Sequence, residues 1–246
     1  MRKLRFTFML AGVLMASFMF QSCSNDDDTY VSYYPNALVT VKSLSDNTCY
    51  LQLDDNTTLR PVNMTKSPFG TKEVRALASL YETNDNPGSY NKSVNVNWID
   101  SIRTKSTVPT AGADNEKLYG SDPIEIIKDW VTIAEDGYLT LRFRTTWGYR
   151  DKIHSVNLIR DVNSSNPYEL ELRHNAYGDT GERVGDGLIA FNLKDLPDTQ
   201  GKTVKLKLNW ISFSGNKSAE FDFCSRKTTK TATMTIDNHQ IVTTFK

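Results

Sequence analysis

Apolar and polar residues alternate along much of the chain after residue 36, with the period of two that is typical of a half-buried β-strand. In Tyr138–Arg144 leucine and phenylalanine take one side, and threonine and arginine take the other. Glu169–His174 repeats the pattern, and Lys152–Arg160, which is apolar on both sides and rich in β-branched residues, favours a more central strand. No stretch of the mature chain keeps a helical period, so the pattern predicts an all-β protein.

Residues 37–104 are expected to form the first domain, because short runs of this kind follow one another there between clear turns. The runs are Ala37–Lys42, Cys49–Leu53, Thr57–Pro61, Glu73–Tyr81 and Ser93–Arg103. Asp54-Asp55-Asn56 and Asn84–Gly88 have the residue types of tight turns. Strands of this number and length predict a small five-stranded barrel like the oligonucleotide/oligosaccharide-binding (OB) fold. The name of that fold implies no function.

Residues 129–246 are expected to form the second domain. A hairpin is predicted from Trp130–Ile133 and Tyr138–Arg144 around the turn Glu135-Asp136-Gly137. Further alternating runs follow at Ile189–Leu193, Val204–Trp210, Ala219–Phe223 and Ala232–Ile236. About seven or eight short strands separated by turns predict an antiparallel β-sandwich. Between the two domains, residues 105–128 contain proline and glycine without periodicity, which predicts a linker.

The N-terminus has the pattern of a secretory signal peptide over residues 1–22. Basic residues precede the apolar run Phe6–Phe20, which is too short to cross a bilayer comfortably, and Ser22 precedes Cys23. The segment resembles a bacterial lipoprotein signal, in which the cysteine is acylated and becomes the new N-terminus. Cys23 is therefore the expected lipidation site, and outer-membrane lipid is the expected partner of the acylated residue.

Residues 23–36 are interpreted as an acidic tether next to the lipid. Its first part, Ser24, Asn25, Asp26, Asp27 and Asp28, resembles the surface-export signal of lipoproteins in the Bacteroides group. A solvated spacer is the alternative, because runs of charge are usually solvated. With the export signal, the protein is expected in the outer membrane, lipid-anchored and exposed at the cell surface.

The charge balance bears on nucleic-acid binding, and the cysteine positions bear on a disulfide. The 29 basic and 29 acidic residues balance, and loss of residues 1–22, with three basic and no acidic residues, takes the formal charge from 0 to −3. Residues 37–104 hold equal numbers of both signs, so the predicted barrel offers no basic groove of the kind that nucleic acid requires, and we expect no nucleic-acid partner. Cys49 and Cys224 fall in different predicted domains, which argues against a disulfide although export permits one.

Two histidines raise the question of catalysis, because His154, His174 and Asp179 could supply a metal site or a general base. Each histidine is in phase with the apolar residues of its own strand, which indicates that both rings point into the sandwich. We therefore interpret them as core histidines with hydrogen-bond partners. No phosphate-binding loop, nucleophile elbow or paired-cysteine spacing is present. We expect no catalytic residues, no metal site and no cofactor.

The lipoprotein signal, the small barrel and three segments of the second domain together resemble the NigD-like lipoproteins of the Bacteroides group. The segments are Asp136-Gly137-Tyr138-Leu139-Thr140-Leu141, His154-Ser155-Val156-Asn157-Leu158, and Leu172-Arg173-His174-Asn175-Ala176 with Gly178-Asp179. The resemblance covers nearly the whole chain and implies an N-terminal OB barrel and a C-terminal β-sandwich. The family is named for an operon associated with a bacteriocin, which implies a role in its production or in immunity. The resemblance brings no catalytic residues.

Trp147 and Tyr149 are the candidate binding residues, because they lie in a turn where a ring has little core to enter. A glycan or a partner protein could stack there, although Trp147 could equally fold down over the end of the sheet. The leading hypothesis is a non-enzymatic, cell-surface lipoprotein that binds a ligand or partner. The alternatives are a secreted hydrolase or metal-binding protein that uses His154 and His174, and a subunit of a surface fibre that donates Gln240–Phe245 to a neighbour.

Overall fold

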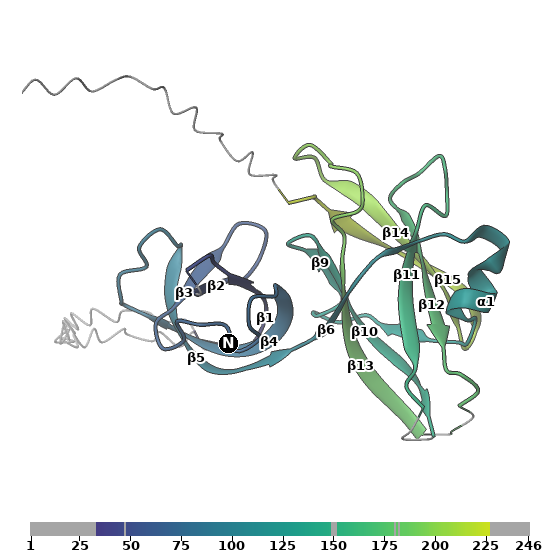
Figure 1. Cartoon of the computed structure of the whole chain (residues 1–246), viewed down its shortest axis with the longest axis horizontal. Helices are drawn as coiled ribbons and strands as arrows, with labels where there is room; N and C mark the ends of the chain where they lie inside the picture. Colours follow the sequence, from purple (N-terminus) through teal and green to yellow (C-terminus); the bar gives the residue numbers. More distant parts are fainter. Residues whose placement is uncertain (1–32, 47, 149–151, 180, 182, 227–246) are drawn as a thin grey trace, which may run out of the picture. The chain divides into compact units, whose positions relative to one another are not determined.

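The computed structural model describes residues 33–46, 48–148, 152–179, 181 and 183–226. Cys23, the segment 24–28, Tyr149 and the predicted strands after residue 231 lie outside the described residues. The described part is all-β, as predicted, with a barrel followed by a sandwich (Figure 1). Its helices are single turns, and none of them is long and apolar enough to span a bilayer. Cys49 and Cys224 are free thiols.

The barrel is formed by the first five strands and closes in the order β1-β2-β3-β5-β4, which confirms the OB-type prediction. The strands are β1 (Tyr33–Ser43), β2 (Cys49–Gln52), β3 (Thr58–Pro61), β4 (Val74–Thr83) and β5 (Lys92–Ser101). Asp54 makes the turn after β2, because its Oδ1 accepts hydrogen bonds from the backbone N–H groups of Asn56 and Thr57. Inward-facing aliphatic residues such as Val39, Leu51 and Leu80 fill the interior.

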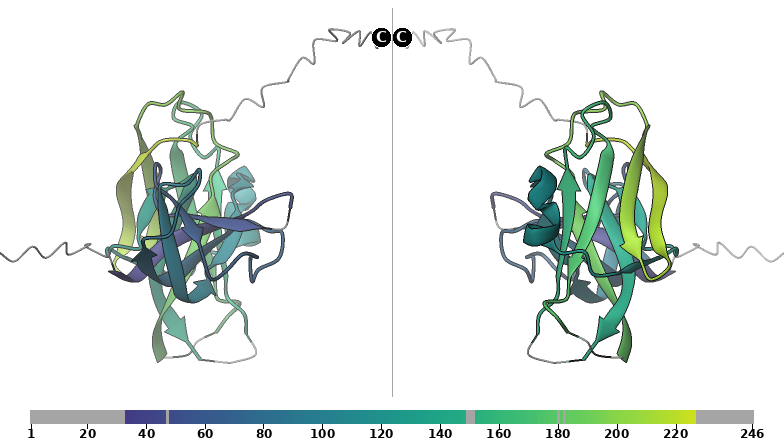
Figure 2. Two further views of the ribbon diagram at one scale, coloured as in Figure 1. Left: turned by 90° about the vertical axis from the view of Figure 1, so that its left-hand side faces the viewer. Right: turned by 90° about the vertical axis from the view of Figure 1, so that its right-hand side faces the viewer.

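The sandwich consists of two sheets whose inner faces share one apolar core. The first sheet contains β6 (Arg103–Ser106), β13 (Arg183–Asn192), β10 (Tyr138–Trp147), β8 (Glu125–Ile127) and β9 (Ile133–Glu135). The second contains β15 (Gly215–Phe223), β14 (Val204–Ser212), β12 (Glu169–Asn175), β11 (Ser155–Arg160) and β7 (Val108–Pro109). Figure 1 shows them as separate layers, and the right-hand view of Figure 2 faces the second sheet, with yellow-green β14 and β15 beside its green strands.

The predicted hairpin is present, with a later first strand. β9 pairs with β10 across a two-residue turn in which Asp136 and Gly137 have φ values of 47° and 70°, the backbone that an Asp-Gly hairpin turn requires. The strand predicted at Trp130–Ile133 begins only at Ile133, because Asp129 starts a turn there. The Oδ1 of Asp129 accepts the N–H of Val131, and its carbonyl accepts the N–H of Thr132.

The linker prediction for residues 105–128 is wrong. β6 pairs with β13, β7 pairs with β11 and β8 pairs with β10, so this segment contributes to both sheets. Between β7 and β8 lie the 3-10 turn η1 (Gly112–Asp114) and the single helical turn α1 (Asn115–Tyr119). Strands of two to four residues are too short to show a period, which is why the sandwich has ten described strands instead of seven or eight. Three of its pairings are parallel, so it is not purely antiparallel.

The prediction that Lys152–Arg160 forms a central strand is also wrong. β11 is next to the end of its sheet, and the end strand β7 pairs only with Ile159 and Arg160. The apolar residues on the second side of β11 are there for another reason. The segment that contains α1 packs on the outer face of β11 and β12, and Ile159 is fully buried there. Apolar residues on both sides of a strand therefore show that both sides are covered, and not that the strand is central.

Barrel and sandwich share buried contacts. Leu38 and Ile102 pack with Tyr138 and Ala190 in one apolar cluster. Beside it, the fully buried Arg75 of β4 forms an ion pair of 3.0 Å with Glu135 of β9.

Candidate functional site

The predicted histidines meet at one end of the sandwich in a buried row with Asp179. Nδ1 of His154 lies 3.0 Å from Nε2 of His174, and Nε2 of His154 lies 3.2 Å from Oδ2 of Asp179. At the other end of the row, Nδ1 of His174 lies 3.2 Å from the carbonyl oxygen of Pro123. The side chains of His154 and Asp179 are 1% and 0% exposed, and His174 as a whole is 1% exposed. The inward orientation predicted from the alternation is therefore correct.

The donors and acceptors of this row determine how many protons it holds. The carbonyl of Pro123 can only accept, so Nδ1 of His174 donates to it. The row has three hydrogen bonds, whereas an ionised Asp179 and two neutral rings supply two protons. A third proton, on His154 or on Asp179, completes the row and makes it electrically neutral. Burial, followed by the nearby His154, lowers the pKa of His174, which favours its neutral form.

Asp179 is held by the backbone as well as by His154. The N–H of Gly148 donates to Oδ2 at 2.9 Å, and the N–H of Gly181 donates to Oδ1 at 3.0 Å. The two glycine backbones approach so closely that a Cβ on either would overlap the other. The hydrogen bonds of the row therefore connect the segments that follow β10 and β12 with the residue before β11 and with Pro123, which precedes β8. This is a structural arrangement, because every ring nitrogen already has a partner and a general base must reach its substrate.

The described residues contain no group of three or more His, Cys, Asp or Glu side chains arranged to hold a metal ion. Trp147, which we expected in a turn, is the last residue of β10 and folds down over the row. Its ring stacks on His154 with centroids 4.2 Å apart and planes 19° apart. Its Nε1–H donates to the carbonyl of Gly185 at 3.3 Å. Of the two orientations considered from the sequence, Trp147 takes the folded one.

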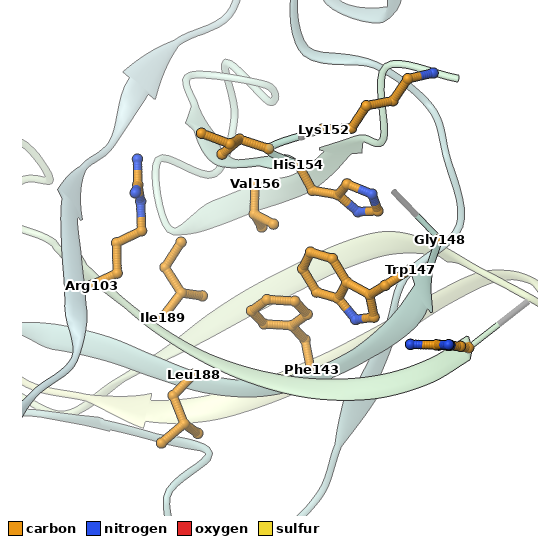
Figure 3. Close-up of a pocket in the computed structure, with 11 residues that line it drawn as sticks. Arg103, Phe143, Trp147, Gly148, Lys152, His154, Val156, Leu188 and Ile189 are labelled. Carbon is orange, nitrogen blue, oxygen red and sulfur yellow. The ribbon is translucent and has the colours of Figure 1, made fainter. Parts of the chain in front are cut away.

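A pocket of about 480 Å³ opens beside Trp147, within the size range of small-molecule sites. Figure 3 shows Phe143, Trp147, Val156 and Ile189 around one space between the sheets, with Arg103 at its edge. The apolar lining is Phe143, Trp147, Ile153, Val156, Leu188 and Ile189, and the basic lining is Arg103, Lys152 and Arg183. No described lining residue carries a carboxylate.

The basic residues of the pocket differ in how they are held. Lys152 donates to the carbonyls of Tyr177 and Gly178, at 3.3 and 3.0 Å. Within the described part of the chain, Arg103 and Arg183 make no side-chain hydrogen bond or ion pair, and Arg183 is exposed. The nearest acid along β13, Asp186, is already paired with Arg142 and Arg144, whose hydrogen bonds lower its pKa to about 2.

Trp147 and His154, both singled out from the sequence, line the pocket, whereas its other lining residues were not predicted. The lining residues come from β6, β10, β11 and β13 and from the connection between β10 and β11, and these strands become neighbours only through the fold. Arg103 carries no local signal at all, because the sequence places it at the end of a barrel strand. The usable signal was Gly185 and Gly187, two glycines in one strand, which often mark a close approach of other groups. Trp147 and Phe143 lie over them.

Comparison with known proteins agrees with this architecture. The family model for the NigD-like C-terminal beta sandwich domain matches residues 106–223, and that for the NigD-like N-terminal OB domain matches residues 38–102. The chain belongs to the NigD-like family. The C-terminal match begins at residue 106, so it includes most of the segment that we expected to be a linker. A search of curated proteins found no match.

Solved structures with the same fold come from the Bacteroides group. A protein of Parabacteroides distasonis described as toxin-related is 36% identical, with a TM-score of 0.67 over 79% of this chain and 94% of that one. A protein of unknown function from Bacteroides vulgatus is 20% identical, with a TM-score of 0.60 over 78% and 90%. A NigD-like immunity protein from Bacteroides caccae is 19% identical, with a TM-score of 0.52 over 77% and 93%. At such identities the last two show the fold alone.

Proposed function

We propose that this NigD-like protein is a non-enzymatic, lipid-anchored binding protein of the cell surface, and that its binding site is the pocket beside Trp147. The pocket carries the proposal, because it combines an apolar lining with two arginines that have no acidic partner among the described residues. Exposed apolar surface of this kind often marks a binding site, and basic side chains beside it favour a partner of complementary charge. In the family context, the partner belongs to a bacteriocin system, in which this protein has an accessory or immunity role.

Two observations support the family-based part of this proposal. A relative of 36% identity is described as toxin-related, and a structure of the same fold is a NigD-like immunity protein. A hydrolase that uses His154 and His174 has less support, because both side chains are about 1% exposed and their nitrogens are occupied. The donated strand of a fibre subunit, Gln240–Phe245, lies outside the described residues. Self-assembly that rises with protein concentration would favour that alternative.

The binding site is tested by recovering its occupant. The protein is released from membranes of the bacterium that makes it and weighed by native mass spectrometry, beside a Val156→Phe variant whose larger ring fills the pocket. The matched control is Val96→Phe, which makes the same change in a partly buried residue of the barrel. We expect a bound species on the wild type and on Val96→Phe, and none on Val156→Phe. A bound species that Val156→Phe retains, or none on the wild type, contradicts the proposed site.

The surface location is tested separately, through the residues after Cys23. Changing Asp26, Asp27 and Asp28 to Asn keeps the length and polarity of the tether and removes its charge. If the residues form an export signal, protease added to intact cells digests less of the variant, while the membrane-bound total stays constant. A Cys23→Ala variant serves as the control for anchoring and should leave the membrane. Equal digestion of the triple-Asn variant and the wild type contradicts the signal and leaves a solvated spacer.

A further inference from the structure

The outer edge of β13 is unpaired beside the pocket. β13 spans Arg183–Asn192 and pairs along its whole length with β10, but on its other side β6 pairs only with residues 189–192. Among the described residues no strand pairs with 183–188 on that side. In the other sheet, β11 is likewise paired by the short end strand β7 only at Ile159 and Arg160. The pocket therefore lies between two strand edges, each open over part of its length.

An unpaired edge with backbone N–H and C=O groups is a template for another strand, and folded proteins usually block it. This edge carries two charged residues, Arg183 and Asp186, but it has neither a proline nor a β-bulge. The open stretch Arg183–Leu188 has no proline, includes two glycines, and exposes 66% of Val184. Across the mouth of the pocket Ile153 is 76% exposed.

The sheet has a cavity on each face beside this edge, which could accept the side chains of an added strand. Successive side chains of a strand point to opposite faces of its sheet. On the inner face lies the pocket beside Trp147, and on the outer face lies a second cavity of about 240 Å³, lined by Trp130, Val131 and Gly187 among others. Leu188 borders both. A strand placed beside β13 would therefore have a space for its side chains in each direction.

Arg103 and Arg183, which have no acidic partner in the part of the chain that the structure describes, lie near opposite ends of the open edge. Arg183 begins β13, and Arg103 pairs with Ile189 in the neighbouring position. Six residues of strand separate Arg183 from Ile189, which corresponds to roughly 20 Å. An extended chain that follows this stretch of backbone reaches both ends of it, and so can contact both arginines. Among the described lining residues there is also no amide or carboxylate side chain that would hold the hydroxyl groups of a glycan.

We propose that the partner of this protein contributes an extended peptide segment that adds as a strand beside residues 183–188 of β13, with apolar side chains toward the pocket and a carboxylate near each end. The main chain of the segment pairs with the edge of β13, and its acidic residues pair with Arg183 and Arg103. This inference rests on the proposed function, and it specifies the partner as protein.

The test is selection from a phage-displayed library of random peptides of about eight residues, a length that spans the open edge. The immobilised targets are the wild type, an Arg103→Gln/Arg183→Gln variant, and a Lys117→Gln/Lys202→Gln control, whose lysines are exposed and do not line the pocket. We expect the wild type and control to enrich peptides with an apolar centre flanked by acids. The arginine variant should bind these peptides at least about tenfold more weakly, the effect of losing one good charge-assisted hydrogen bond.

A second measurement identifies the binding mode. The best peptide is resynthesised with alternate backbone nitrogens methylated, first on one set and then on the other, so that one version cannot pair with β13. That version should bind at least about tenfold more weakly, and the unmodified peptide should slow hydrogen exchange in residues 183–188. No enrichment, enrichment without acids, equal binding by the arginine variant, or equal binding of both methylated versions overturns the inference. If one of these results accompanies a small molecule that Val156→Phe displaces, the proposed function stands and only the peptide assignment fails.

Discussion

Two groups of basic side chains in this protein are held in opposite ways. Arg75 is fully buried and bonded to Glu135 and to the hydroxyl of Thr40, at 3.0 Å each. Arg226 is bonded to Asp136 and Glu73, at 2.8 and 2.7 Å. Around the pocket, Arg103 and Arg183 have no acidic partner among the described residues, although most of the sandwich's other described arginines do. The first group lies where barrel and sandwich touch, and the second lies along an open strand edge.

We interpret the paired arginines of the first group as stabilising the fold, and the arginines beside the pocket as available to bind a partner. A buried cation must be neutralised within the chain, because an uncompensated buried charge costs several kcal/mol. Burial raises the pKa of Glu135 while Arg75 opposes that rise, which shows how closely the two depend on each other. An exposed arginine costs little when unpaired, so nothing in the folding of the chain requires Arg103 or Arg183 beside an apolar pocket.

The largest effect is expected from Arg75→Met. The substitution leaves the carboxylate of Glu135 partly buried without its cation, and leaves the hydroxyl of Thr40 without its donor. Breaking such a pair costs about 3–5 kcal/mol. Denaturant unfolding, monitored by tryptophan fluorescence, measures the free energy of unfolding. An Arg75→Met/Glu135→Gln double variant should lose less than Arg75→Met alone, because it removes the stranded charge. Equal losses would mean that the ion pair is not the cause.

A smaller loss is expected from His174→Ala. The ring is 1% exposed and bonded at both nitrogens, so the substitution leaves a cavity and strands the carbonyl of Pro123. Buried polar-to-small changes of this kind cost about 1–3 kcal/mol. Chemical denaturation at neutral pH measures the loss. An unchanged stability would show that the row is not structural and would reopen a functional role for its histidines.

The row also predicts a pH dependence. Burial lowers the pKa of His174 below its ordinary value of 6.5. Below pH 6.5 the unfolded chain therefore takes up a proton at this residue that the folded chain does not, so stability falls as the pH falls. The slope from this one group is at most about 1.4 kcal/mol per pH unit. Unfolding free energies at pH 7.5 and 5.5 should differ more for the wild type than for His174→Gln. The same difference in both proteins would contradict the neutral form of His174.

The long alternating runs and the tight turns were predictable because they depend on neighbours in the sequence. β12, for example, buries every second residue, as its pattern requires, and Asp136-Gly137 forms the hairpin turn. The strands β6, β7 and β8 were not predictable, because a run of two to four residues has no measurable period. The buried Arg75 gave no signal either, since one arginine in an apolar strand acquires meaning only through Glu135, which is 60 residues away.

The candidate site was predictable in its buried part and not in its open part. The phase of His154 and His174 with their apolar neighbours was enough to place both rings inward, where they lie. The pocket depends on which strands are neighbours. Arg103 and Ile189 are far apart in the sequence and become adjacent through the parallel pairing of β6 with β13, a pairing that no local pattern specifies.

The most direct test of the separation between structural and binding charges is the free energy of unfolding of Arg103→Gln/Arg183→Gln. The account predicts a value within about 0.5 kcal/mol of the wild type, as for exposed residues without partners, from the same variant that loses peptide binding. It also predicts a far larger loss for Arg75→Met in the same experiment. A loss in the double arginine variant that approaches the loss in Arg75→Met would contradict the account, because it would show that Arg103 and Arg183 serve the fold.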